Sequence, residues 1–178
     1  MMAINYCLVK PSSESKAKIL KFVDMLWNQV GEQVLKMKSG ERLRPAFVFA
    51  YEDSAQVMWL SLTEQTKLQV MAAIRAEAAK VANVEKLVFG ALCMPSLVTE
   101  LTPSAKEGMH HEKIVMHIET PHAEWLMASG AIEWHSNGAM SLSKREDRWL
   151  DENDGWDLEG QMVGFFPNSK VARASMIN

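Results

Sequence analysis

The feature of this sequence that most constrains its fold is the unbroken apolar run LVFGALCM at residues 87–94. Such a run is too short to cross a membrane, which needs about 20 apolar residues. It is typical of a strand that is covered on both faces. Pro95 is expected to end this strand, and residues 96–110 are expected to form a loop or a covering arm. The chain therefore needs a sheet with residues 87–94 at its centre.

Two stretches repeat apolar residues at intervals of three and four, which places those residues on one face of a helix. The first covers residues 12–38, with Ser12 or Ser13 as its N-terminal cap and Ser39-Gly40 as its stop. The second covers residues 64–82 and follows Thr63. The expected buried residues are Ile19, Val23, Leu26, Val30, Val34 and Met37 in the first helix, and Leu68, Met71, Ile74, Ala78 and Val81 in the second.

The remaining apolar segments have β-type patterns. Residues 46–51 and 56–62 flank a short polar turn, and residues 131–135 and 139–143 flank Ser136-Asn137-Gly138, so both pairs predict hairpins. Residues 112–120 alternate between apolar and polar, whereas residues 122–129 fit a strand or a short helix. The predicted fold is a two-layer α+β sandwich of order α-β-β-α-β-β-β-β, with both helices on one face of a mostly antiparallel sheet.

The 178 residues are 48% hydrophobic and 23% charged, which is typical of one globular domain. We expect a single domain over residues 1–178, with a core at about 12–166 and a loose tail at 167–178. Cys7 and Cys93 lie in apolar surroundings, which favours buried thiols in a reducing compartment. Residues 1–10 lack the pattern of a signal peptide. The expected location is therefore the cytoplasm, without a membrane anchor.

The order of elements over residues 12–145 resembles a group of small uncharacterised proteins of phages and bacteria. In that group a helix also precedes a hairpin, a second helix, an apolar strand and a terminal meander. The resemblance is one of layout and includes no diagnostic motif. Here Arg44-Pro45 opens the hairpin, and Cys93-Met94-Pro95 follows the central strand where the group has a Glu-Ala-Trp-like end. The resemblance implies an α+β fold and a relation to phages or mobile elements, and it implies no activity.

All five histidines lie between residues 110 and 135, together with several glutamates. Imidazole and carboxylate are natural ligands of zinc and similar divalent metals. His117 and Glu119 would share one face of a strand, and a neighbouring strand could bring His135 beside them. This set would hold a hydrolytic metal, with help from His110, His111 or His122. The spacing matches no established metal motif, so ordinary surface or hydrogen-bonded histidines are the favoured interpretation and no cofactor is predicted.

Residues 146–159, here called the acidic tryptophan segment, contain seven acidic residues and one basic residue. Tryptophans are enriched where protein interfaces concentrate their binding energy, and acidic neighbours attract a basic partner. The alternative is a solvated loop whose tryptophans fold back onto the core. The segment predicts a partner-binding surface formed by Trp149, Trp156, Asp151, Asp154 and Asp157.

Two further alternatives concern the first half of the chain. The helix at 12–38 is surrounded by basic residues that could contact nucleic acid, although an amphipathic helix commonly carries lysines on its exposed side. Cys93 could act as a nucleophile, but packing is favoured because cysteine is commonly buried. Net charge is −3, whereas a chain that binds polyanions with its whole surface is usually basic.

The sequence thus favours a non-enzymatic domain that binds a protein partner through the acidic tryptophan segment. A metal-dependent hydrolase and a nucleic-acid-binding domain are the alternatives. The sequence leaves open a homo-oligomer and does not name the partner.

Overall fold

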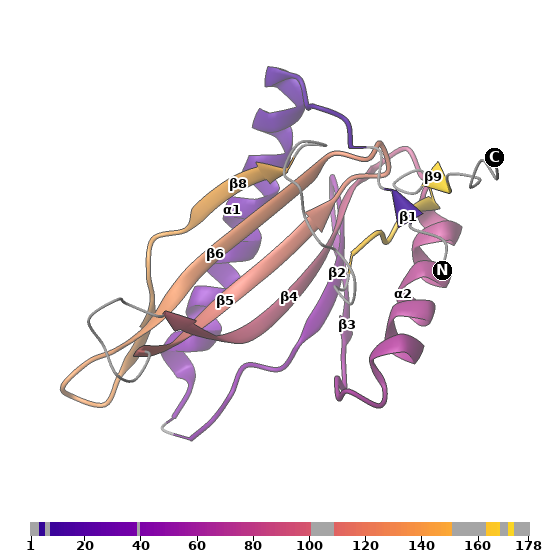
Figure 1. Ribbon diagram of the computed structural model, residues 1–178. Coiled ribbons are helices and arrows are strands. Elements are labelled where there is room, and N and C mark those ends of the chain that lie inside the picture. Colours follow the sequence, from indigo (N-terminus) through magenta and orange to yellow (C-terminus); the bar gives the residue numbers. More distant parts are fainter. Residues whose placement is uncertain are drawn as a thin grey trace.

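The computed structural model describes residues 4–5, 8–38, 40–100, 109–150, 163–167 and 171–172 (Figure 1). Within these residues, the main sheet has seven strands, and neighbouring strands are antiparallel. The order is β3-β2-β4-β5-β6-β7, and β8 also pairs with β6. These strands are β2 (Ala46–Tyr51), β3 (Ala55–Trp59), β4 (Leu87–Glu100), β5 (Met109–Glu119), β6 (Trp125–Trp134), β7 (Met140–Leu142) and β8 (Glu146–Leu150). The helices are α1 (Ser13–Lys36) and α2 (Lys67–Val81), and β1 (Ile4–Asn5) pairs with β9 (Val171–Ala172).

The helix α1 forms where the apolar periodicity predicts it. The hydroxyl of Ser12 accepts a hydrogen bond from the Ser15 N–H at 3.1 Å, which satisfies one of the donors that a helix leaves free at its start. Its buried stripe is Ile19, Val23, Trp27, Val30 and Val34. Trp27 takes a place that the prediction gave to its neighbour Leu26, which is only partly buried.

The helix α2 is shorter than predicted, because residues 64–66 form a turn before it. Thr63 and Thr66 close this turn, since the hydroxyl of each accepts a hydrogen bond from the backbone N–H of the other. Met71, Ile74 and Ala78 are buried as expected. Leu68 is 82% exposed, so its predicted burial is wrong.

The α+β class, the two helices and the antiparallel sheet are confirmed, but the layers differ from the prediction. Cross-strand partners point to the same face of a sheet, and the pair Phe47–Leu92 packs with α2. The neighbouring pair on the other face includes Ala91, which packs with α1. The helices therefore cover opposite faces and form three layers with the sheet, with α1 behind β4–β6 and α2 beside β3 in Figure 1. Placement of both helices on one face was wrong, because the central strand is apolar on both sides.

The strand β4 continues through Pro95 to Glu100, so the prediction that Pro95 ends it was wrong. The last pair between β2 and β4 is Ala46–Cys93, and beyond it the described pairing of β4 is with β5 alone. A proline, which lacks a backbone N–H, is tolerated where a strand has lost a neighbour. The expected loop at 96–110 is thus strand at residues 96–100 and 109–110, and residues 101–108 lie outside the described part.

Of the ambiguous residues 122–129, residues 125–129 form the first half of β6, and residues 122–124 precede the strand. The predicted turn at Ser136-Asn137-Gly138 is confirmed: Gly138 has a φ of +79°, and the backbone of His135 pairs with that of Ala139. Within the described residues, neither helix is long and apolar enough to span a membrane.

Candidate functional site

The predicted ligands His117 and Glu119 lie together on the face of the sheet that α2 covers. Both are buried, with 5% and 0% exposure, and the Nε2 of His117 is 2.9 Å from the Glu119 Oε1. Trp125 and Phe165 pack edge-on against the imidazole at 5.1 and 5.5 Å between ring centroids. Among the described residues, no group forms a hydrogen bond with the buried Nδ1 of His117.

Both oxygens of Glu119 bind the backbone of a distant part of the chain. Oε1 accepts a hydrogen bond from the Gly164 N–H at 2.5 Å, and Oε2 accepts one from the Phe165 N–H at 2.7 Å. Arg75 of α2 donates to the carbonyls of Val163 and Gly164 at 2.9 and 3.1 Å. The sheet and α2 thus hold the 163–167 segment from two sides, and hydrogen bonds to charged groups are the stronger kind. The pair His117–Glu119 therefore holds the 163–167 segment against the sheet.

The prediction that a neighbouring strand brings His135 beside these residues was wrong. The register of β5 on β6 places His117 opposite Met127. His135 comes eight residues later, roughly 25 Å along an extended chain. It is exposed there, with its Nε2 2.6 Å from the Ser141 hydroxyl. Among the described residues, no group of three or more His, Cys, Asp or Glu side chains is arranged to hold a metal ion. The structure describes no side chain for His110 or His111.

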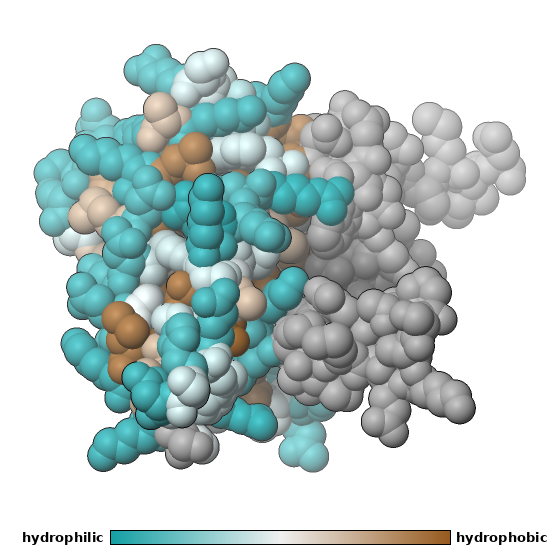
Figure 2. All heavy atoms as spheres, turned by 90° about the vertical axis from the view of Figure 1, so that its left-hand side faces the viewer, coloured by the Kyte–Doolittle hydropathy of each residue, from teal (hydrophilic) through white to brown (hydrophobic). Residues whose placement is uncertain are grey.

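The acidic tryptophan segment begins with β8, and its residues from 151 on lie outside the described part. Trp149 is half-buried and packs against the core beneath α1, and the Lys16 ammonium lies 5.6 Å from its ring centroid. Figure 2 shows the side of the molecule that lies on the left of Figure 1, where the described surface is mainly hydrophilic with apolar residues in small groups. The predicted partner surface around Trp149, Trp156, Asp151, Asp154 and Asp157 stays a prediction.

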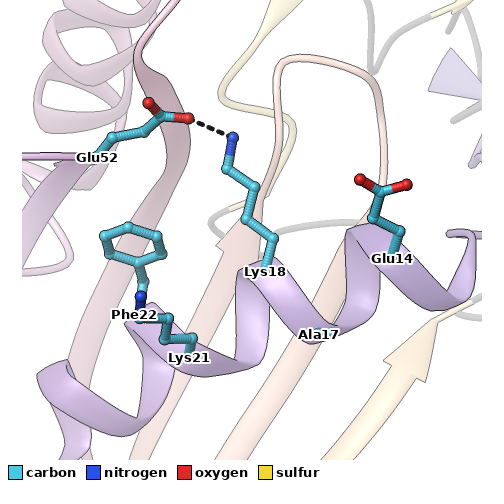
Figure 3. Close-up of a pocket in the computed structure, with 6 residues that line it drawn as sticks. All are labelled: Glu14, Ala17, Lys18, Lys21, Phe22 and Glu52. Atoms are coloured by element: carbon cyan, nitrogen blue, oxygen red, sulfur yellow. Dashed lines mark hydrogen bonds and ion pairs between the residues drawn. The ribbon is translucent and has the colours of Figure 1, made fainter.

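The basic side of α1 borders a shallow open depression of about 520 Å³ beside the β2–β3 turn (Figure 3). Lys18 forms an ion pair with Glu52 at 2.5 Å across it, and Lys21 and Glu14 also line it. Two lysines of the predicted nucleic-acid face, Lys16 and Lys18, are therefore engaged within the chain. Positive and negative side chains both line the depression, so it does not favour a ligand of either charge.

Cys93 lies on the opposite side of the sheet from His117, among the residues that pack under α1. It is 3% exposed, and burial raises the pKa of its thiol to about 12. The thiolate is the nucleophilic form of cysteine. A thiol with this pKa is almost wholly protonated near neutral pH, which supports the packing role for Cys93.

The most exposed apolar strand of the described sheet is β3. Val57 is 48% exposed and Trp59 is 57% exposed, and both lie on the face that α1 covers further along the sheet. The guanidinium of Arg44 stacks 5.9 Å from the centroid of the Trp59 ring. Tryptophan and arginine are the residue types most enriched at binding hot spots. This strand therefore combines the side chains and the exposure of a contact surface.

The outer side of the β3 backbone pairs with no other strand among the described residues. At the two ends of the hairpin, Leu60 N–H donates to Pro45 C=O, and Tyr51 N–H donates to Ser54 C=O. Backbone groups of successive residues in a strand point to opposite sides. Gln56 and Met58 therefore bond to β2, and the groups of Ala55, Val57 and Trp59 point away from it. In the described residues, β3 pairs with β2 alone and forms one edge of the sheet.

Sequence reasoning identified β3 as half of a hairpin but not as a site. The available signal was the composition AQVMW, which lacks the charge, proline or bulge that edge strands commonly carry. That signal is informative only once β3 is known to be the edge strand.

No family model, no curated protein and no solved structure matches this chain.

Proposed function

We propose that this chain is a protein-binding domain that takes up an extended segment of polypeptide beside β3. The observation that carries the proposal is the outer edge of β3, where the backbone groups of Ala55, Val57 and Trp59 point away from β2. In strand addition, backbone hydrogen bonds supply affinity and side chains at alternate positions supply specificity.

The side chains of β3 suit this use. Val57 and Trp59 add apolar area that an incoming strand would cover, and Arg44 lies against the Trp59 ring. Natural proteins protect an exposed edge strand with charges, proline or bulges, and β3 contains none of these. An edge that lacks protection supports a role in binding.

Position 57 allows a selective test. Replacement of Val57 by proline removes one outward N–H and leaves the hydrogen bonds of Gln56 and Met58 to β2 in place. Val57→Thr is the matched control, since it keeps the N–H and the branched β-carbon. A photo-reactive amino acid at the exposed position 55 would then report what lies beside β3 in living cells.

We expect irradiation to join position 55 to one discrete peptide, identified by mass spectrometry. Val57→Pro should remove this product and Val57→Thr should keep it. A photo-reactive residue at Leu68, which is 82% exposed on α2, serves as the control position. The same product from position 68, or its persistence in Val57→Pro, would contradict the proposal, and so would the absence of any product.

A further inference from the structure

We infer that the polypeptide taken up beside β3 is the β3 of a second copy of this chain, paired antiparallel about a two-fold axis at Val57. This inference rests on the function proposed above and names the partner. Such a dimer would join two seven-stranded sheets into one continuous sheet.

The first argument is the backbone pattern. The outward-pointing groups belong to Ala55, Val57 and Trp59, so Val57 is at the centre of the set. Antiparallel strands exchange two hydrogen bonds at each hydrogen-bonded pair of residues. An axis at Val57 therefore matches every outward donor with an outward acceptor, which gives about six hydrogen bonds between the copies. The edge is complementary to itself.

The second argument is the fit of the side chains in that register. Val57 lies opposite Val57 of the second copy, and Trp59 lies opposite its Ala55. On the other face, Gln56 lies opposite Met58 of the second copy. Each bulky indole thus meets a small methyl group, and pairs of aromatic and branched side chains stabilise adjacent strands. Trp59 would lose much of its 57% exposure.

The third argument is charge. The strand β3 has no charged residue, so self-pairing sets no like charges against each other. The pairing also brings Arg44 of one copy towards the turn at Glu52 and Asp53 of the other. Those carboxylates already pair with Lys18 and Lys86, so that end of the strand is electrically balanced. Like charges directly opposite each other would have been destabilising.

On the opposite side of the sheet, β8 lacks this property. The strand β8 has the sequence EDRWL with Arg148 at its centre, so antiparallel self-pairing about its centre would set Arg148 against Arg148. Closed homodimers use the same patch of both copies. Of these two strands, β3 is the one that satisfies that condition.

The test is the mass of the purified full chain in solution, measured by sedimentation equilibrium over a range of concentrations. We expect wild type and Val57→Thr to reach twice the chain mass of 20.0 kDa. Val57→Pro should stay at 20.0 kDa with an unchanged circular dichroism spectrum. Trp59→Ala, which keeps every backbone group, should weaken self-association by roughly tenfold or more.

A cross-linking measurement tests the register. In a Cys7→Ser background, Val57→Cys should join two copies through a short thiol-reactive linker, whereas Leu68→Cys should not. If Val57→Pro fails to fold, Trp59→Ala and the cross-link at position 57 still decide the outcome.

Three results would overturn the inference. These are a wild type that remains at 20.0 kDa throughout, a dimer that Val57→Pro and Trp59→Ala leave intact, and an equal cross-link from position 68. The proposed function fails separately. A monomeric chain whose position 55 joins a different protein in cells would remove the self-pairing and leave strand uptake by β3 standing.

Discussion

The two faces of the sheet are closed in different ways. Behind one face, α1 buries a continuous apolar stripe over β4, β5 and β6, and Trp27 fits against Gly130, where an added Cβ would lie 2.6 Å from its ring. On the other face, α2 covers β2 and β4, and Phe165 and Phe166 of the 163–167 segment pack into the same cluster. That segment is held by Glu119 and Arg75 through charge-assisted hydrogen bonds.

The difference separates two sources of stability. Apolar packing under α1 depends on shape and buried area. Attachment of the 163–167 segment combines the burial of Phe165 and Phe166 with hydrogen bonds from two charged side chains to its backbone. A short segment held by few bonds can open locally at a lower free energy than the centre of a sheet. We therefore expect the face under α1 to become exposed only when the whole protein unfolds. On the other face, the 163–167 segment should detach in partial opening events of lower free energy.

The strongest test of the first face is Trp27→Ala. Removal of this buried indole leaves a cavity against Gly130, and we expect the free energy of unfolding to fall by about 3–5 kcal/mol. Urea denaturation followed by circular dichroism measures the change. Met25→Ala is the control on the same helix, because Met25 is 55% exposed, and it should change stability by less than about 0.5 kcal/mol. Equal effects of the two substitutions would contradict the packing described for α1.

The matching test of the second face is Glu119→Gln. An amide presents a single acceptor oxygen, so the N–H of Gly164 or of Phe165 loses its partner. We expect a loss of about 1–3 kcal/mol. Amide hydrogen exchange should locate that loss at residues 164 and 165, with little change at the centre of β4. A uniform loss of protection across the sheet would show that the two faces open together.

The smallest expected effect is a difference in labelling rate between the native thiol of Cys93 and a thiol introduced at position 163. Cys93 and Val163 are each 3% exposed, one at the sheet centre and one in the 163–167 segment. Burial raises the pKa of Cys93 to about 12, so this thiol is protonated at pH 8 and reacts only when the structure opens.

In a Cys7→Ser background, Cys93 should label slowly at pH 8 and rapidly in concentrated urea. A cysteine introduced by Val163→Cys should label faster than Cys93 in the native state, measured with a thiol-specific reagent. Equal native rates at both positions would remove the distinction between the faces.

Much of the fold could be predicted because its signals are local. The Ser12 cap, the periodicity of α1 and the Asn137-Gly138 turn each depend on residues close together in the chain, and each appears as expected. The run at 87–94 even indicated cover on both faces of the central strand. The predicted placement of both helices on one face conflicted with that indication, and the structure resolves the conflict in favour of the run.

The candidate sites depended on information that is not local. The distance between His117 and His135 follows from the register of β5 on β6, which aligns His117 with Met127. The contact of Glu119 with Gly164 joins residues 45 positions apart, and no short pattern announces it. The edge position of β3 requires knowledge of every other pairing in the sheet.

By itself, the sequence determined the two helices and most of the central strands, because apolar periods of three to four residues and of two residues depend only on residues close together in the chain. Only the tertiary structure decided which face each helix covers, which histidines lie together and which strand is left at the edge. Those outcomes depend on pairing between segments that are far apart in the chain. The free energy of such pairing depends on the residues of both segments, so neither segment predicts it alone.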